Sequence, residues 1–139
     1  MPRTSRIVAA LLVSFSLLAC GKREQAAERD AVLHALDALR DAPSTDLPRR
    51  RGLLQAVERT AATAPEILRA RDTCVAAYRP LLDGTELQEG IRAELAKADP
   101  APSLIGRLLE AEAKIKQSAT VMPDCERAIA DLRLPGGAH

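Results

Sequence analysis

Apolar residues recur along most of this chain with the three- and four-residue spacing of amphipathic helices, and no long stretch alternates as a half-buried strand would. The first pattern predicts a helix from about Arg23 to Asp41. Residues 42–48 contain two prolines and small polar residues, and they are expected to form a loop before a second helix. The apolar stripes of these two helices comprise Val32, Leu33, Leu36 and Leu39, then Leu53, Leu54, Val57, Ala61 and Ala64.

Capping signals and prolines divide the middle of the chain. Residues 63–66 (Thr-Ala-Pro-Glu) resemble a capping box with an early proline, so a break or kink is expected near Thr63. Pro80 is expected to tighten or end the next helix before Asp83-Gly84. Residues 85–88 (Thr-Glu-Leu-Gln) form a second capping box, which predicts the start of another helix. The stripes here comprise Ile67, Leu68, Cys74, Val75, Tyr78, Leu81 and Leu82, then Leu87, Ile91 and Leu95.

The prolines of residues 99–102 should stop that helix, and Ser103 can cap the next one. Pro123 is expected at the first position of a last short helix, and residues 134–139 should be a loose tail. The inward faces comprise Leu104, Ile105, Leu108, Ile115 and Ala119, then Cys125, Ile129 and Leu132. Short loops between amphipathic helices favour an antiparallel bundle. The sequence therefore predicts an all-α fold, a small antiparallel bundle of about four to five helices over residues 23–133.

The N-terminus carries a different signal. Arg3 and Arg6 precede an uncharged, mostly apolar run over residues 7–18, which at 12 residues is too short to span a bilayer as a helix. Leu17-Leu18-Ala19-Cys20 follows, and residues 1–21 resemble the signal peptide of a bacterial lipoprotein ending in a lipobox. The resemblance implies removal of residues 1–19 and acylation of the Cys20 thiol, for example with palmitate. Ordinary secretory cleavage, with Cys20 as a bystander, is the alternative.

The same resemblance implies a location. Residues 20–22 would form the lipidated anchor and a short tether of about 7–14 Å, which would keep the domain close to the membrane. Gly21 stands where an aspartate tends to retain such lipoproteins in the inner membrane of Gram-negative bacteria. The expected location is therefore the outer membrane, facing the periplasm. Lys22 and Arg23 could contact anionic headgroups beside the anchor.

Composition excludes several classes of binding protein. Cleavage would leave 120 residues with Tyr78 as the only aromatic residue, and the loss of Arg3 and Arg6 would change the formal net charge from +1 to −1. Sugar platforms, quaternary-ammonium cages and base-stacking surfaces depend on exposed aromatic faces. A nearly neutral chain also gives no reason to expect a nucleic-acid partner.

Two cysteines remain after the lipobox. In an oxidising periplasm, Cys74 and Cys125 are expected to form a disulfide that closes a loop of about 50 residues. The alternative is two separate core cysteines. A redox catalyst is not indicated, because the C-x-x-C spacing is missing.

Charged residues at unusual positions suggest two further sites. Arg71 and Glu112 both fall on apolar stripes, so they are hypothesised to form a buried ion pair across two helices. Both could instead snorkel to water at the end of a seam. Arg49, Arg50 and Arg51 stand at an expected helix start, where they could contact an anion, although a solvated charge run is the ordinary interpretation.

No metal, cofactor or catalytic site is predicted. His34 is expected to face solvent and His139 lies in the tail, and neither has other ligands at metal-binding spacing. The chain lacks nucleophile, zinc-protease and phosphate-loop motifs, so it is not expected to be an enzyme. The sequence favours a lipid-anchored helical protein of the cell envelope that binds another envelope protein near the membrane surface. The alternatives are a carrier of a small ligand, metal or haem in the bundle core, and a passive structural lipoprotein.

Overall fold

A computed structural model describes residues 7–97 and 102–134, with side chains from residue 21 onward. Four helices follow one another in this part of the chain: α1 (Ile7–Asp41), α2 (Leu47–Arg59), α3 (Pro65–Leu95) and α4 (Leu104–Arg133). The described residues contain no strand. The predicted all-α fold and helical bundle are confirmed.

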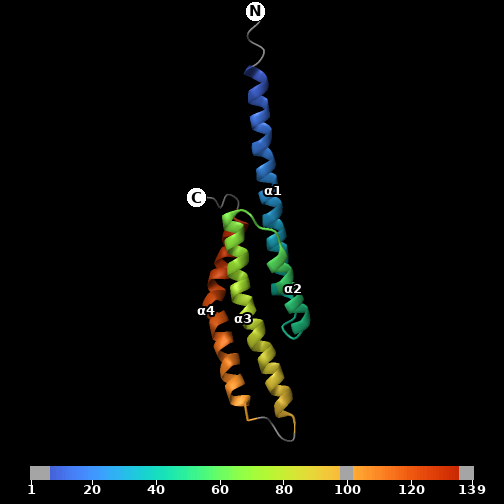
Figure 1. Cartoon of the computed structure of the whole chain (residues 1–139), viewed down its shortest axis with the longest axis vertical. Coiled ribbons are helices and arrows are strands. Elements are labelled where there is room, and N and C mark those ends of the chain that lie inside the picture. Colours follow the sequence, from blue (N-terminus) through green and yellow to red (C-terminus); the bar gives the residue numbers. More distant parts are fainter. Residues whose placement is uncertain (1–6, 98–101, 135–139) are drawn as a thin grey trace, which may run out of the picture.

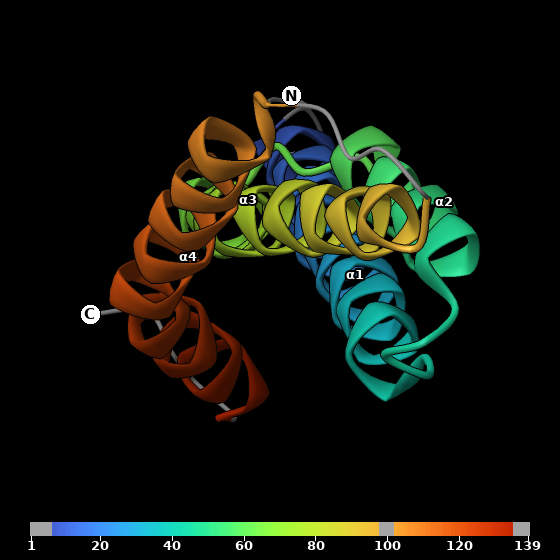
Figure 2. The same ribbon diagram turned by 90° about the horizontal axis from the view of Figure 1, so that it is seen from below.

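The helices differ in length, and this sets the shape of the molecule. α3 and α4 form a long antiparallel hairpin, and α1 and α2 pack beside the half of it that contains the start of α3 (Figure 1). The N-terminal half of α1 extends away from the other helices, and the last turns of α3 and first turns of α4 project beyond α1 and α2 in the opposite direction (Figure 1). The hairpin is also seen end-on in Figure 2. The molecule is therefore elongated, with its two extremities formed by different helices.

The first helix ends at Asp41 as predicted, but it begins earlier than Arg23. It runs from Ile7 through residues 20–22, where a short tether was expected. Asp46 then caps α2, since its carboxylate accepts a hydrogen bond from the backbone N–H of Arg49 at 3.1 Å. A capping carboxylate also offsets the positive end of the helix dipole.

The break near Thr63 is confirmed, but the predicted capping box does not form. α2 ends at Arg59, and α3 begins with Pro65 in its first turn and with no side-chain cap on Ala64. Thr63 instead donates hydrogen bonds to Glu28 of α1, from its backbone N–H and from its hydroxyl. The threonine therefore holds the connection between α2 and α3 against α1.

The predicted end of a helix at Pro80 and the predicted start at Thr85 are both wrong, because α3 is continuous through these positions. Thr85 lies in the helix interior, where its hydroxyl donates to the carbonyl of Leu81 at 2.7 Å. Proline removes one hydrogen bond from the helix ladder, here the bond to the carbonyl of Ala76. Ala76 is exposed, so water can satisfy that carbonyl, and packing against the other helices holds α3 together.

The last helix behaves in the same way. Pro123 does not start a separate helix, since α4 runs from Leu104 to Arg133 without a break. The carbonyl that Pro123 leaves free is that of Ala119, and both residues are exposed. Ser103 stands at the N-cap position of α4, but its side chain makes no capping hydrogen bond.

Small residues line the seam between α3 and α4. The buried residues of α4 recur every seven positions, and four buried residues of α3 follow the same spacing, which is the repeat of a coiled-coil seam. They comprise Leu104, Ala111, Ser118, Cys125 and Leu132 on α4, and Ala70, Ala77, Gly84 and Ile91 on α3. The predicted disulfide lies in this seam, with the Cα atoms of Cys74 and Cys125 4.6 Å apart.

Gly84 shows how closely the two helices approach. A Cβ atom at this position would lie 2.9 Å from the carbonyl oxygen of Ala111 and 2.8 Å from Cγ1 of Ile115. The glycine that was expected to mark a turn is therefore needed for contact between two helices. The rest of the core is aliphatic apart from Tyr78, and its members from α1 and α2 comprise Val32, Leu36, Leu39, Leu54 and Val57.

Candidate interaction surface

The projecting end of the α3–α4 hairpin carries most of the exposed apolar surface. Among the described residues, the exposed large hydrophobic side chains are Leu95, Ile105, Leu108 and Leu109 near this end, and Leu134 at the other end of α4. Their exposed fractions near the hairpin end range from 42% for Leu108 to 75% for Ile105. We call Leu95, Ile105, Leu108 and Leu109 the tip patch. Exposed leucines are common singly, but a contiguous apolar patch is typical of an interaction site.

The residues of the tip patch on α4 share one side of the helix. At 100° per residue, Ile105, Leu108 and Leu109 fall within about 100° of one another. Leu108 lies next to the side that faces α3, and Ile105 and Leu109 lie progressively further around the helix. Leu95 and Leu108 line a shallow depression of about 290 Å³ between the two helices, together with Gln88, Ile91 and Arg92.

The opposite flank of the hairpin is polar and charged. The carboxylate of Asp83 on α3 forms an ion pair with the guanidinium of Arg51 on α2 at 2.7 Å. It also lies 3.8 Å from the ammonium group of Lys114 on α4. Lys114 also lies 3.9 Å from Glu110. The two flanks therefore differ in chemistry, and the tip patch is confined to one of them.

The sequence predictions for the tip patch were partly wrong. Leu95, Ile105 and Leu108 were assigned to inward-facing stripes, but the structure leaves them exposed, and Leu109 was not considered. The seven-residue repeat of α4 was the missed signal, because it runs through Leu104 and Ala111 and leaves residues 105, 108 and 109 outside the seam.

The three consecutive arginines do not form a common anion site. The Arg51 guanidinium donates to both oxygens of Glu86 and to Asp83, and these carboxylates raise its pKa well above the ordinary value. Arg50 is buried, with 9% of its surface exposed, and its Nε atom has no hydrogen-bond partner. Arg49 remains exposed, with its backbone N–H on Asp46. The predicted shared contact is therefore not assembled, because the side chains have different surroundings.

The predicted ion pair between Arg71 and Glu112 is also wrong. Arg71 donates from Nη1 to the carbonyl oxygen of Thr60 and from Nε to Asp72, both at 2.9 Å. Glu112 is exposed on α4. Arg71 is half-buried near the start of α3. Its guanidinium satisfies the carbonyl of Thr60, which directly follows α2, and it does not reach across to α4.

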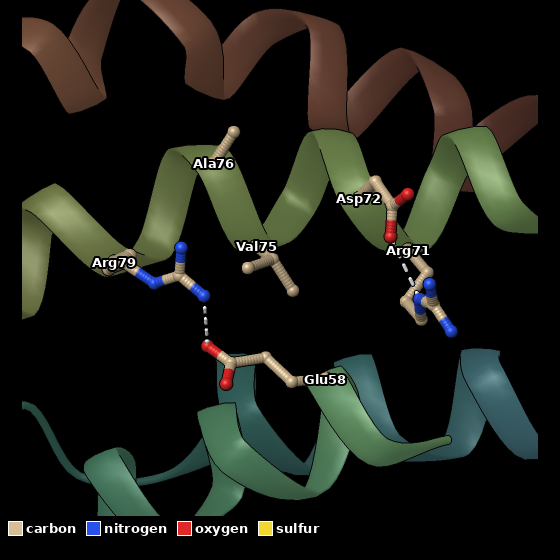
Figure 3. A pocket seen from close by; sticks show the side chains of 6 residues that line it. All are labelled: Glu58, Arg71, Asp72, Val75, Ala76 and Arg79. Atoms are coloured by element: carbon tan, nitrogen blue, oxygen red, sulfur yellow. Dashed lines mark hydrogen bonds and ion pairs between the residues drawn. The ribbon is translucent and has the colours of Figure 1, made fainter. Parts of the chain in front are cut away.

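Arg71 also lines a groove of about 360 Å³ between α2 and α3 (Figure 3). Across this groove, Arg79 forms an ion pair with Glu58 at 2.7 Å. Arg71 forms a second ion pair with Asp72, and Val75 lies between the two pairs (Figure 3). Both arginines are neutralised by carboxylates of the protein itself. The groove therefore presents no free positive charge to an anionic ligand.

The remaining candidate residues show no catalytic arrangement in the described part of the chain. Burial raises the pKa of the Tyr78 hydroxyl above its usual value, although nearby Arg50 and Arg40 act in the opposite direction. His34 is exposed, and His139 lies outside the described residues. No three His, Cys, Asp or Glu side chains gather as potential metal ligands in residues whose side chains are described.

The segment that resembles a lipobox lies beyond the side chains that the structure describes. Arg3 and Arg6 are outside the described residues, and Cys20 is described only as part of the backbone of α1. None of the helical segments that the structure describes has both the length and the apolar character needed to cross a bilayer.

Comparisons of this chain with models of known protein families, with curated protein sequences and with solved structures found no match.

Proposed function

We propose that this chain is a lipid-anchored protein of the bacterial cell envelope that binds a protein partner through its tip patch. In this proposal, Cys20 carries the acyl chains, and the location is the outer membrane facing the periplasm. The single observation that carries the binding role is the position of the tip patch, which lies at the end of the molecule opposite the N-terminal half of α1 (Figure 1).

The lipobox-like segment supports the anchor. Leu17-Leu18-Ala19 directly precedes Cys20, and an uncharged run precedes them. Several acyl chains hold a protein stably at a membrane, whereas one chain binds only marginally. Lys22 and Arg23 are both exposed on α1, where they are available to anionic headgroups.

The length of the hairpin supports a partner at a distance from the membrane. α3 alone contains 31 residues, which corresponds to about 46 Å at 1.5 Å per residue. Since α1 is helical through residues 20–22, the bundle follows the anchor without an irregular linker. The tip patch would therefore stand several nanometres from the lipid, in reach of a periplasmic protein or the projecting part of an envelope assembly.

The anchor is tested with the full chain in a Gram-negative host. Wild-type protein should incorporate labelled palmitate and fractionate with the envelope, and Cys20→Ser should abolish both. An unlabelled wild-type protein, or labelling that persists in Cys20→Ser, would overturn the lipid anchor.

The binding role is tested by crosslinking. A photoreactive residue at Leu109 should yield one dominant crosslinked protein in intact cells. Glu110 is exposed on the polar flank of α4, about 100° around the helix from Leu109, so the same photoreactive residue at position 110 is the matched control. No product from position 109, or equal products from both positions, would overturn the assignment of the tip patch.

A further inference from the structure

The tip patch contains a protruding side chain and a depression at the same height along the hairpin. Gly84 contacts α4 between Ala111 and Ile115, and therefore lies level with about residue 113. The helices are antiparallel, so eight residues further along α3 correspond to eight residues back along α4. Ile105 is therefore level with Arg92. Along α3, Arg92 stands between Gln88 and Leu95, and all three residues line the depression.

We propose that two copies of this chain pair through their tip patches, about a two-fold axis parallel to the hairpin. This axis lays α4 of each copy against α3 of the other at the same height. Ile105 of one copy then enters the depression of the other, and the contact occurs twice, as in an isologous interface. The arrangement is a knob-into-hole contact between helices. This dimer makes a second copy of the chain the partner in the binding role proposed above. The dimer depends on the proposed function only in assuming that both copies are anchored in one membrane.

Shape and composition favour a second copy as the occupant. The depression is shallow, with a volume of about 290 Å³, and its lining includes the apolar side chains of Ile91, Leu95 and Leu108, so an aliphatic side chain can fill part of it. Ile105 is aliphatic and 75% exposed, so it can serve as that side chain without rearrangement. Pairing also gives four helices at the projecting end, where one copy contributes α3 and α4 alone among the described helices (Figure 1). Four helices can enclose an apolar core that two helices leave open.

Charge does not oppose this pairing. Arg92, at the edge of the depression, forms an ion pair with Glu89 on the same helix. The edge therefore presents balanced charge to an identical surface, and its arginine stem can cover apolar atoms of the partner. The processed chain would carry a formal net charge of −1, since Arg3 and Arg6 are removed from a chain of +1, so repulsion between copies is weak.

The direction of the axis agrees with a common anchor. A two-fold axis parallel to the hairpin places the N-terminal ends of both copies on the same side, so both Cys20 residues can enter one membrane. Two chains held in one membrane meet at a raised effective concentration, which allows a small interface to form. An axis perpendicular to the hairpin would place the two anchors at opposite ends.

Two differently tagged full-length copies provide the test in cells. One copy carries Ile105→Cys and the other carries Arg92→Cys, and the dimer is read on a non-reducing gel as a band with both tags. We expect this band under oxidising conditions, and its loss when Ala113→Cys replaces Ile105→Cys, because Ala113 lies eight residues, about 12 Å, further along α4. The absence of the band, or an equal band from the Ala113→Cys control, would overturn the dimer. A dominant Ile105→Cys band with itself would overturn the parallel axis.

A second measurement avoids added thiols. The molar mass of the detergent-solubilised full chain should correspond to a dimer, and Ile105→Glu should weaken dimerisation at least about tenfold, because burying the carboxylate is costly. Ala113→Glu should remain dimeric and share the helical circular dichroism of the wild type. A wild-type monomer would overturn the dimer. If the copies pair but no palmitate enters the protein, the anchor fails and the dimer stands. If Leu109 crosslinks only to a different protein, the dimer fails and the binding role stands.

Discussion

Glu28 of α1 accepts two hydrogen bonds of 2.8 Å from Thr63, one from the backbone N–H and one from the hydroxyl. The two residues are 35 positions apart, and Thr63 lies two residues before the start of α3. One carboxylate therefore ties the first helix to the connection between the second and third helices. These hydrogen bonds favour the ionised form and lower the pKa of Glu28.

This contact should make stability depend on pH. Because folding lowers the pKa of Glu28, its contribution is complete above the ordinary carboxyl pKa and disappears as the pH falls through the lowered value. We expect Glu28→Gln to be less stable than the wild type in urea at about pH 7, and the difference to shrink at about pH 3. Glu24→Gln, one turn earlier on an exposed position of α1, is the charge-matched control. A Glu28→Gln deficit that stays constant between the two pH values would contradict the assignment.

Gly84→Ala should destabilise the protein, although alanine is the better helix former. The new methyl group would meet Ala111 and Ile115 at distances below 3 Å, and overpacking of this kind typically costs about 1–3 kcal/mol. Gly52→Ala in α2 is the control, because no atom lies within 4 Å of its added Cβ. It should instead gain up to about 1 kcal/mol from helix propensity. Urea unfolding of both variants measures the contrast, and a stabilised Gly84→Ala would show that the helices do not approach so closely.

Loss of the disulfide should be costly for so small a core. Cys74 and Cys125 are 51 positions apart, and chain-entropy estimates for such a loop are about 4 kcal/mol. We expect Cys74→Ala/Cys125→Ala to unfold at lower urea, and dithiothreitol to destabilise the wild type by a similar amount. Dithiothreitol should leave the double variant unchanged. Equal stability of wild-type protein with and without the reductant would mean that the disulfide does not form.

Neighbouring arginines should respond in opposite ways to the same substitution. Arg50 is buried with an unpaired Nε atom, so Arg50→Met removes a desolvated donor and should be neutral or stabilising by about 1 kcal/mol. Arg51→Met removes hydrogen bonds to Asp83 and Glu86 and should destabilise by about 1 kcal/mol at low salt, less at high salt. Thermal unfolding at two salt concentrations separates the two. A clear loss of stability in Arg50→Met would reveal a partner for its side chain.

The sequence alone determined the helical class, the division near Thr63 and the pairing of Cys74 with Cys125. These features depend on local signals: the spacing of apolar residues, a proline suited to a first helical turn, and the two cysteines of residues 21–139. Only the tertiary structure decided whether Pro80 and Pro123 end their helices. Each leaves one carbonyl unpaired, and the result depends on whether that carbonyl faces water and whether packing holds the helix.

The tip patch also required the tertiary structure. Leu95, Ile105 and Leu108 have the spacing of core residues, and a helical pattern cannot distinguish a face covered by another helix from one that projects beyond its neighbours. The last turns of α3 and the first turns of α4 extend beyond the ends of α1 and α2, and this leaves the apolar residues at the end of the hairpin exposed (Figure 1). Arg71 illustrates the same limit. Its place on an apolar stripe was visible in the sequence. The Thr60 carbonyl that accepts its hydrogen bond is brought near only when α3 packs against α2.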